Sequence, residues 1–437
     1  MILPAFVPLV AILATFTDAK KGVPSGHPID PEVHALRLAF AKDVVAPASP
    51  ITLPTNVAFQ SVVKPLISKV DVDQITTYLT RLTQFPERHY KSQNGVDAAN
   101  WILNSVQSLS APSGTKITAS LFKHSKWIQP SVIARYESTN ATSVDGIIVT
   151  GTHFDTAAYD HPDGPGGANP AADDCASGST VIYETLRVLT KSGFVPNRPI
   201  EFHWYAAEEF GLLGSYEIAH DYARRGVSVV SYLNLDQSGY IAPGSKPVIG
   251  IMADYVTPEA TKFLTSVATA YSGLPVVGGQ KCGYECTDNA AWYNAGYNSA
   301  LAFEGLMENA FPNNDKTNTD GSPLDTLEFV DMNHVAAFAK NTIGFVVELS
   351  LAGTAVQPST TGKPQTTTSA AKSTSVRPST TFAPKCNHSE CTAGPLLNKG
   401  CSACATAVCK QDSYCCSNQW DDQCVGQVNQ YCTTVSC

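Results

Sequence analysis

The residues best suited to chemistry are a histidine and several carboxylates between positions 149 and 236. His153 and Asp155 follow the β-branched run 147–150, which predicts a buried strand. Because side chains two residues apart on a strand share a face, both should point the same way. A histidine that binds a metal usually donates its second ring N–H to a carboxylate. The pair therefore predicts a metal ligand and the residue that orients it.

More carboxylates stand at the ends of the elements that follow. Asp174 precedes a segment with helical spacing of apolar residues, Glu208 and Glu209 follow the apolar run 200–205, and Asp236 ends another such run. Adjacent side chains diverge at a strand end, so one glutamate can bind a metal while its neighbour acts as a general base. Open α/β sheets bind ligands outside the carboxyl ends of their strands. The spacing therefore predicts a hydrolytic site with a pair of divalent metal ions.

Longer motifs around these residues carry a resemblance to a known family. THFDT, DDCASG, AAEEFGLLGS and YLNLD occur in this order, together with TQFPERHY, CGYEC, WYNAGY and AFE. Over residues 73–351 the chain resembles the secreted co-catalytic di-zinc aminopeptidases, the family of bacterial leucyl aminopeptidase. The resemblance implies an α/β fold with a mixed, mostly parallel central sheet flanked by helices. It also implies removal of N-terminal, leucine-like residues from peptides.

The resemblance assigns a role to each matching residue. Two Zn²⁺ ions would share Asp174 as a bridge, and Glu208 would take a proton from the attacking water and pass it to the leaving amine. Asp155 would orient the ligating histidine. The metal ligands that the resemblance implies are His153, Asp174, Glu209 and Asp236.

The resemblance extends to the surroundings of the site. The family commonly has a cis peptide after the bridging aspartate, which here would join Asp174 to Cys175. Cys282 and Cys286 would form a small disulfide loop, from which Tyr284 would reach the substrate.

One ligand departs from the family pattern. The family supplies its last ligand from a histidine about eleven residues after the glutamate of AFE, where this chain has Asp315. We expect Asp315 to replace that histidine, with Asp320 as second choice, and we expect His334 to lie on a helix surface. An extra carboxylate makes the second site more tolerant of Mn²⁺ or Co²⁺. The alternative is a mono-metal or weakly active relative, such as a glutaminyl cyclase-like or surface-binding protein.

The rest of the chain divides by composition. Residues 1–19 are apolar and predict a signal peptide, with a short membrane anchor as the alternative. The Pro-rich stretch that follows is either a propeptide or an N-terminal extension packed on the catalytic domain. A Ser/Thr/Pro-rich linker without acidic residues separates the catalytic domain from the C-terminal module. The expected segments are 1–19, 20–72, 73–352, 353–385 and 386–437.

The last segment contains ten of the thirteen cysteines. In a secreted chain this density predicts five disulfides, with adjacent Cys415 and Cys416 bonding elsewhere; zinc bound by CSAC is the alternative. Cys175 would then remain as a free, buried thiol. The aromatic side chains of the module fit a small core or a binding face, so a cell-wall, polysaccharide or protein surface is a candidate partner. These aromatic residues are Tyr414, Trp420 and Tyr431.

Charge and sequons agree with a secreted, extracellular monomer that acts on peptides or proteins. The net charge is −9 and 15% of residues are charged, without a basic cluster, which argues against nucleic acid as a partner. Asn140 and Asn387 lie in N-glycosylation triplets. After residue 19 the sequence has no apolar segment long enough to predict a membrane span.

Overall fold

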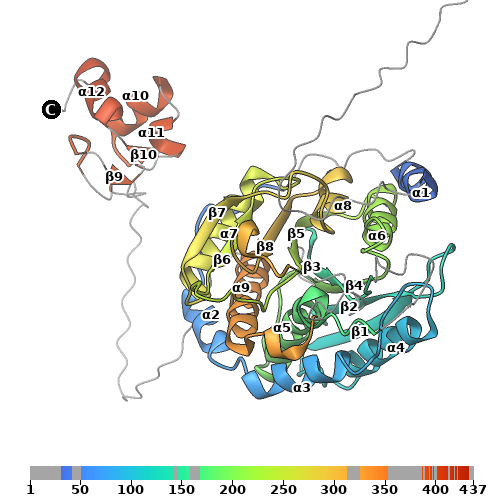
Figure 1. Cartoon of the computed structure of the whole chain (residues 1–437). Helices are drawn as coiled ribbons and strands as arrows, with labels where there is room; N and C mark the ends of the chain where they lie inside the picture. The colour runs from blue at the N-terminus through green and yellow to red at the C-terminus, as the bar shows by residue number, and fades with distance from the viewer. Residues whose placement is uncertain are drawn as a thin grey trace, which may run out of the picture. The chain divides into compact units, whose positions relative to one another are not determined.

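The computed structural model describes two regions of the chain (Figure 1). The first comprises residues 31–41, 51–140, 145–157, 168–312 and 325–352. The second comprises residue 386 and residues 389–392, 394–395, 397, 401–411, 414–417, 419–420 and 422–432. The chain divides into two compact units, Met1–Gln357 and Pro358–Cys437. The predicted signal peptide and linker lie outside the described residues.

A mixed, mostly parallel eight-stranded sheet forms the centre of the first unit, as the sequence predicts. The strand order is β1-β2-β4-β3-β5-β8-β6-β7, and the central strands β4, β3, β5 and β8 are mutually parallel. Strands β1 and β2 are antiparallel additions at one edge. The strands are β1 (Thr115–Phe122), β2 (Ser131–Ser138), β3 (Ile147–His153), β4 (Ile200–Tyr205), β5 (Val229–Leu235), β6 (Ile249–Met252), β7 (Val276–Gln280) and β8 (Ser299–Phe303).

Helices cover both faces of this sheet (Figure 1), which explains why β3, β4 and β5 are buried along their whole length. The larger core lies between one face and the helices α3, α4, α5, α7 and α9. A smaller core lies between the other face and α6 and α8. The helices are α1 (Pro31–Ala41), α2 (Gln60–Ile67), α3 (Val72–Leu82), α4 (Gln93–Gln107), α5 (Gly178–Lys191), α6 (Leu213–Arg224), α7 (Pro258–Tyr271), α8 (Asn289–Asn294) and α9 (Met332–Leu351).

Sequence patterns located the main elements, with small errors at their ends. The helical spacing of apolar residues after Asp73 predicts a helix that Asp73 caps. This helix is α3, but Asp71 caps it: the Asp71 carboxylate accepts hydrogen bonds from the N–H groups of Asp73 and Gln74. The prediction that Asp73 is the cap is therefore wrong, because Asp73 already lies in the first turn. The prediction that His334 lies on a helix surface is also wrong. His334 is on α9 but only 2% exposed, and its Nε2 faces the Val248 carbonyl oxygen.

The segment just before residue 73 packs into the larger core. Leu53, Val63 and Leu66 are buried there. The Glu348 carboxylate on α9 accepts hydrogen bonds from the N–H groups of Ala58 and Phe59 at 2.8 to 3.1 Å. This part of the chain therefore completes the fold of the first unit.

The C-terminal unit is a small disulfide-rich fold. Four of its disulfides are described, and Cys391 is also disulfide-bonded. Cys401 and Cys404 bond to separate partners, so the alternative of zinc bound by CSAC is wrong. Trp420 is fully buried and therefore belongs to the core of the unit. The described pairs are Cys386–Cys401, Cys404–Cys432, Cys409–Cys416 and Cys415–Cys424.

The elements of the C-terminal unit are short. Its described residues form a pair of antiparallel strands and three short helices. They are β9 (Gly394–Pro395), α10 (Ala403–Gln411), α11 (Tyr414–Ser417), β10 (Gln419–Trp420) and α12 (Asp422–Tyr431).

A buried charge on β4 stabilises the face of the sheet below α6. The carboxylate of Glu201 accepts hydrogen bonds from Arg135 at 2.8 Å and from the Tyr222 hydroxyl at 2.7 Å, and lies 3.0 Å from His203 Nε2. Burial alone would raise the pKa of Glu201, but His203, Tyr222 and Arg135 together lower it to about 2. In the folded state Glu201 is therefore ionised at neutral pH.

We predict that Glu201→Gln removes a pH-dependent part of the stability. Because the folded-state pKa is depressed, ionised Glu201 contributes fully above about pH 4.5, and its contribution disappears as the pH falls to about 2. The contribution is about 3 kcal/mol at neutral pH. Urea unfolding of metal-free protein should show the variant less stable at pH 7, with the difference shrinking towards pH 2.

Glu308→Gln, at an exposed position, is the matched control and should behave like the wild type at both pH values. An equal stability loss at pH 7 and pH 2 in Glu201→Gln would contradict the assignment of the effect to ionised Glu201.

Candidate metal centre

The sheet register brings the sequence-predicted residues to one edge. His153 ends β3 and pairs with Tyr205, the last residue of β4, from which the chain runs on to Glu208. Asp236 directly follows β5, the other neighbour of β3. Parallel neighbouring strands point the same way, so these side chains meet outside their carboxyl ends.

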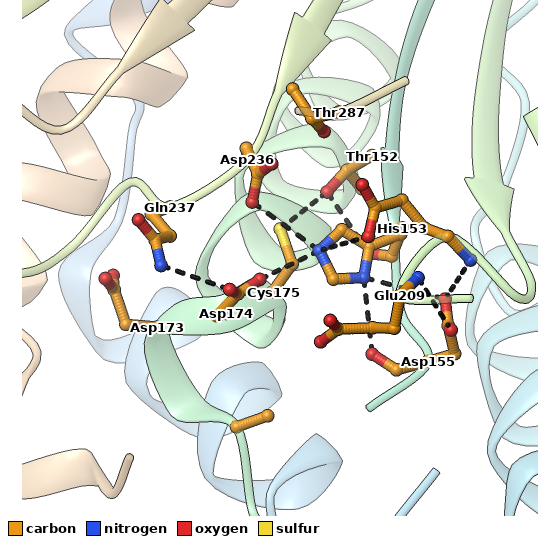
Figure 2. A network of polar contacts seen from close by, with 12 residues as sticks. Thr152, His153, Asp155, Asp173, Asp174, Cys175, Glu209, Asp236, Gln237 and Thr287 are labelled. Carbon is orange, nitrogen blue, oxygen red and sulfur yellow. Dashed lines mark hydrogen bonds and ion pairs between the residues drawn. The ribbon is translucent and has the colours of Figure 1, made fainter. Parts of the chain in front are cut away.

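His153 stands at the centre of the group (Figure 2). Its Nε2 lies 2.8 Å from Asp174 Oδ1, 3.5 Å from Asp236 Oδ1 and 3.9 Å from Glu208 Oε2. The ring is 1% exposed. One imidazole nitrogen therefore faces three carboxylates in a space closed to solvent.

Asp155 connects the histidine to the turn after β4. His153 Nδ1 lies 3.3 Å from the backbone carbonyl oxygen of Asp155 and 3.6 Å from Oδ1 of the Asp155 carboxylate. The same carboxylate accepts hydrogen bonds from the N–H groups of Glu208 at 2.9 Å and Glu209 at 3.3 Å. Asp155 is therefore placed to orient the ring and to fix the two glutamates at once.

A kinked turn, Ala172–Ser177, carries Asp174, and its backbone leaves the helical conformation at Asp174 and Cys175. Its N–H groups at Asp173 and Asp174 donate to the Asp325 carboxylate at 2.8 to 3.0 Å. The Gln237 amide donates to Asp174 Oδ2 at 3.1 Å. The peptide bond between Asp174 and Cys175 is cis, as the resemblance implies. Residues far apart in the chain thus hold the Asp174 carboxylate against His153.

Arg88, in the TQFPERHY segment, ties the surrounding loops together. Its guanidinium donates to the carbonyl oxygens of Phe154 at 2.6 Å, Pro170 at 2.6 Å and Ala171 at 3.0 Å. The side chain is fully buried, and its burial lowers the pKa to about 10, although Asp325 opposes this change. Arg88 therefore remains a cation at neutral pH and joins the loop after β3 to the loop before Asp174.

The buried group contains more carboxyl groups than its own cations could neutralise if all were ionised. Burial raises the pKa of Glu208 well above its usual range despite the nearby His153, and burial followed by the charge of Asp174 raises that of Asp236. Burial alone would lower the pKa of His153, but Glu208 and its other neighbours raise it well above the ordinary value. A divalent cation here would stabilise these carboxyl groups in their ionised form.

The donor set fits such a cation. His153, Asp174, Cys175 and Asp236 each offer one ligand atom, and the four atoms lie within 4.8 Å of one another. Asp236 is 9% exposed, and its Oδ1 accepts no hydrogen bond from any residue in the described ranges. Imidazole and carboxylate groups are ordinary zinc ligands. A buried oxygen without a donor, among other ligating atoms, is the feature that a bound metal would satisfy.

The other predicted site residues lie at different distances from this group. Glu209 Oε1 accepts a hydrogen bond of 3.4 Å from the Ala157 N–H, and Glu209 is outside the four-atom group. Cys282 and Cys286 form the predicted disulfide, and Tyr284 on that loop is 50% exposed. Asp315 and Asp320 lie outside the described residues.

Four residues near the centre were not assigned roles from the sequence. Gln237 and Asp325 hold Asp174 through hydrogen bonds, and the Thr287 side chain lies beside Asp236 (Figure 2). Asp288 is fully buried, and burial raises its pKa to about 7. Gln237 and Thr287 adjoin motifs that the sequence did signal, whereas only the tertiary structure brings Asp325 to the turn.

The fold and the centre together define a metallohydrolase. A buried histidine and carboxylates at the carboxyl ends of parallel strands can hold a metal, and a further glutamate beside them can serve as a base.

Comparison with known proteins places the chain in a family. Residues 131–346 match Peptidase family M28, and residues 384–437 match a domain family of unknown function, DUF8252. Leucine aminopeptidase 1 of Emericella nidulans is 37% identical over 314 residues, covering 69% of this chain and 77% of that protein. A probable leucine aminopeptidase of Arthroderma benhamiae is 34% identical, covering 68% of this chain and 79% of that protein.

Solved structures agree with these relatives. LapB from Legionella pneumophila is 32% identical with a TM-score of 0.61, covering 69% of this chain and 78% of that chain. LapA aminopeptidase from the same organism is 26% identical, also with a TM-score of 0.61, covering 69% of this chain and 77% of that chain. The chain belongs to peptidase family M28 and is a hydrolase of the zinc aminopeptidase type. The resemblance seen in the sequence motifs is thereby confirmed.

We predict that Arg88→Lys loosens metal binding. A lysine ammonium cannot reach three carbonyls in the fixed fork of a guanidinium, so the loops that carry His153 and Asp174 lose their common anchor. The dissociation constant for zinc, measured by chelator competition, should rise by about 10- to 100-fold.

Arg81→Lys, on the exposed surface of α3, is the control and should bind zinc like the wild type. Unchanged zinc affinity in Arg88→Lys would contradict the anchoring role.

Proposed function

We propose that the protein is a secreted aminopeptidase that removes N-terminal, leucine-like residues from peptides. The observation that carries this proposal is the position of Glu208, whose Oε2 lies 3.9 Å from His153 Nε2 at the edge of the candidate metal centre. The relatives of this chain that are named leucine aminopeptidase support N-terminal leucine-like residues as the class of substrate. The intact group of carboxylates supports hydrolysis as the reaction.

Each residue has a distinct task in this proposal. Glu208 takes the proton of the attacking water at its carboxylate and delivers it to the leaving amine. Asp155 holds the Glu208 and Glu209 backbone through two hydrogen bonds and so keeps the base in place. Carboxylates around the centre hold the free α-ammonium of the substrate, which restricts cleavage to the first residue. Tyr284, on the disulfide loop, contacts the substrate side chain.

The metal ligands are proposed as a set of five residues. The group would hold two Zn²⁺ ions, which polarise the scissile carbonyl and lower the pKa of water when they are bound. Asp174 would contribute to both positions, and Asp315 would take the place of the family's last histidine, with Asp320 as second choice. Mn²⁺ or Co²⁺ would be accepted at the oxygen-rich position. The set is His153, Asp174, Glu209, Asp236 and Asp315.

The cellular context is proposed from the sequence and the disulfides. Cys282–Cys286 and the cysteine pairs of the C-terminal unit fit an oxidising, extracellular compartment. Asn140 is exposed at the end of β2, where a glycan would be accepted, and Asn387 is a second candidate outside the described residues. In the part of the chain that the structure describes, no helix is long and apolar enough to cross a membrane.

We predict that Glu208→Gln keeps the metal but loses activity. Glutamine preserves the shape of the side chain yet cannot accept the proton of water, so hydrolysis of leucine p-nitroanilide should fall by about 100- to 10,000-fold. Metal content per chain should equal that of the wild type. Asp174→Ala should lose both metal and activity, since it removes a ligand.

Glu259→Gln on the exposed surface of α7 is the matched control. Substantial activity in Glu208→Gln, with metal retained, would refute the assignment of the base.

We further propose that α1 belongs to a prosegment that restrains the enzyme before maturation. Val33 on α1 contacts Gly211, whose N–H donates to the Glu208 carbonyl oxygen at 2.9 Å. Arg37 forms an ion pair of 3.2 Å with Glu285 on the disulfide loop and stacks on the Tyr216 ring. The helix thus touches both segments that border the centre.

We predict that disrupting this contact activates the unprocessed chain. Arg37→Glu places two negative charges together in a half-buried contact with Glu285, so α1 should detach and kcat/KM for leucine p-nitroanilide should rise several-fold. Leu38→Asp changes an exposed residue of the same helix and should have no effect. Equal activity of Arg37→Glu and wild type would show that α1 is only a packed extension.

A further inference from the structure

Cys175 is a buried free thiol at the proposed metal centre. It is fully buried, and it is the free cysteine of the described chain, whereas the other cysteines whose bonding is described form disulfides. Figure 2 shows its sulfur on the same side of the turn as Asp236 and His153. The proposed function leaves this group without a role.

The position of the sulfur matches that of a ligand. Sγ lies within 4.8 Å of the ligand atoms of His153, Asp174 and Asp236. A tetrahedral zinc ion with bonds of about 2.0 to 2.3 Å holds its ligand atoms about 3.3 to 3.8 Å apart. A movement of about 1 Å or less per side chain would therefore bring the four atoms into one coordination sphere.

Two neighbours favour this approach. Thr152 Oγ1 lies 2.8 Å from Sγ and can donate a hydrogen bond to a thiolate. A Cβ atom on Gly178 would lie 2.7 Å from both Sγ and the Asp236 carbonyl oxygen, so glycine allows the two segments to come together. Asp236 Oδ1, which accepts no hydrogen bond within the described residues, faces the same space and lies 3.5 Å from His153 Nε2.

Resting on the proposed metallopeptidase function, we propose that Cys175 is an additional ligand of the metal ion bound by His153, Asp174 and Asp236. As the sulfur–metal bond forms, the thiol proton leaves to bulk water. The two metal positions are then chemically different. The thiolate position prefers soft ions such as Zn²⁺, whereas the position at Glu209 has oxygen donors and accepts harder ions.

Cobalt substitution tests the bond directly, because a thiolate bound to Co²⁺ gives a charge-transfer band in the near ultraviolet. Full-length wild type loaded with Co²⁺ should show this band. Cys175→Ser should lack it while keeping the visible bands of bound Co²⁺, since three other ligands remain. Visible bands without the charge-transfer band in the wild type would overturn the proposal.

Proton release gives an independent reading. In weak buffer, metal binding should release one proton more per chain from wild type than from Cys175→Ser, because serine keeps its proton. Equal release would overturn the proposal. Cys175→Ala, which removes the donor atom altogether, serves as a second variant and should match Cys175→Ser in proton release and in the missing charge-transfer band.

A parallel assay separates this proposal from the proposed function. Turnover of leucine p-nitroanilide by the zinc-loaded wild type, with no thiolate band in its cobalt form, rejects Cys175 as a ligand and leaves the aminopeptidase function standing. A thiolate band without turnover supports the ligand and contradicts the function. Failure of the wild type to bind Co²⁺ contradicts both.

Discussion

The structure depends on an electrostatic constraint at the end of three parallel strands. His153, Asp174, Glu208 and Asp236 are all nearly excluded from water, and burial raises the pKa of Glu208 and of Asp236. Carboxylates in such a place need compensating positive charge. Beside the group, the buried guanidinium of Arg88 bonds to backbone carbonyls of the loops. The carboxyl groups that it leaves uncompensated are suited to a divalent cation.

The same constraint explains how the fold is organised around the site. The apolar strands β3, β4 and β5 are covered on both faces, so polar side chains can only gather where the strands end. Asp155 then couples the first strand end to the turn that carries Glu208 and Glu209. In the proposed mechanism, this carboxylate would position both the metal ligand His153 and the base Glu208 before substrate arrives.

Local patterns predicted much of this arrangement and missed what depends on long-range contact. The run 200–205 is β4, and the resemblance of DDCASG correctly implied the cis peptide after Asp174. The sequence could not show that Asp325 caps the turn of Asp174, since about 150 residues separate them and nothing local marks the pairing. The prediction for His334 is wrong because its ring faces the carbonyl oxygen of Val248, 86 residues away, and a helical pattern alone does not specify such a contact.

We propose that this group of residues binds a pair of metal ions, and anomalous diffraction at the zinc edge from crystals of the zinc-loaded protein tests this binding most directly. We expect two peaks about 3.5 to 4 Å apart on either side of Asp174. One should be bordered by His153 and Asp236, with Cys175 beside it, and the other by Glu209. The absence of any peak between His153 and Asp174, under conditions where the protein hydrolyses leucine p-nitroanilide, would show that these residues do not form the metal site.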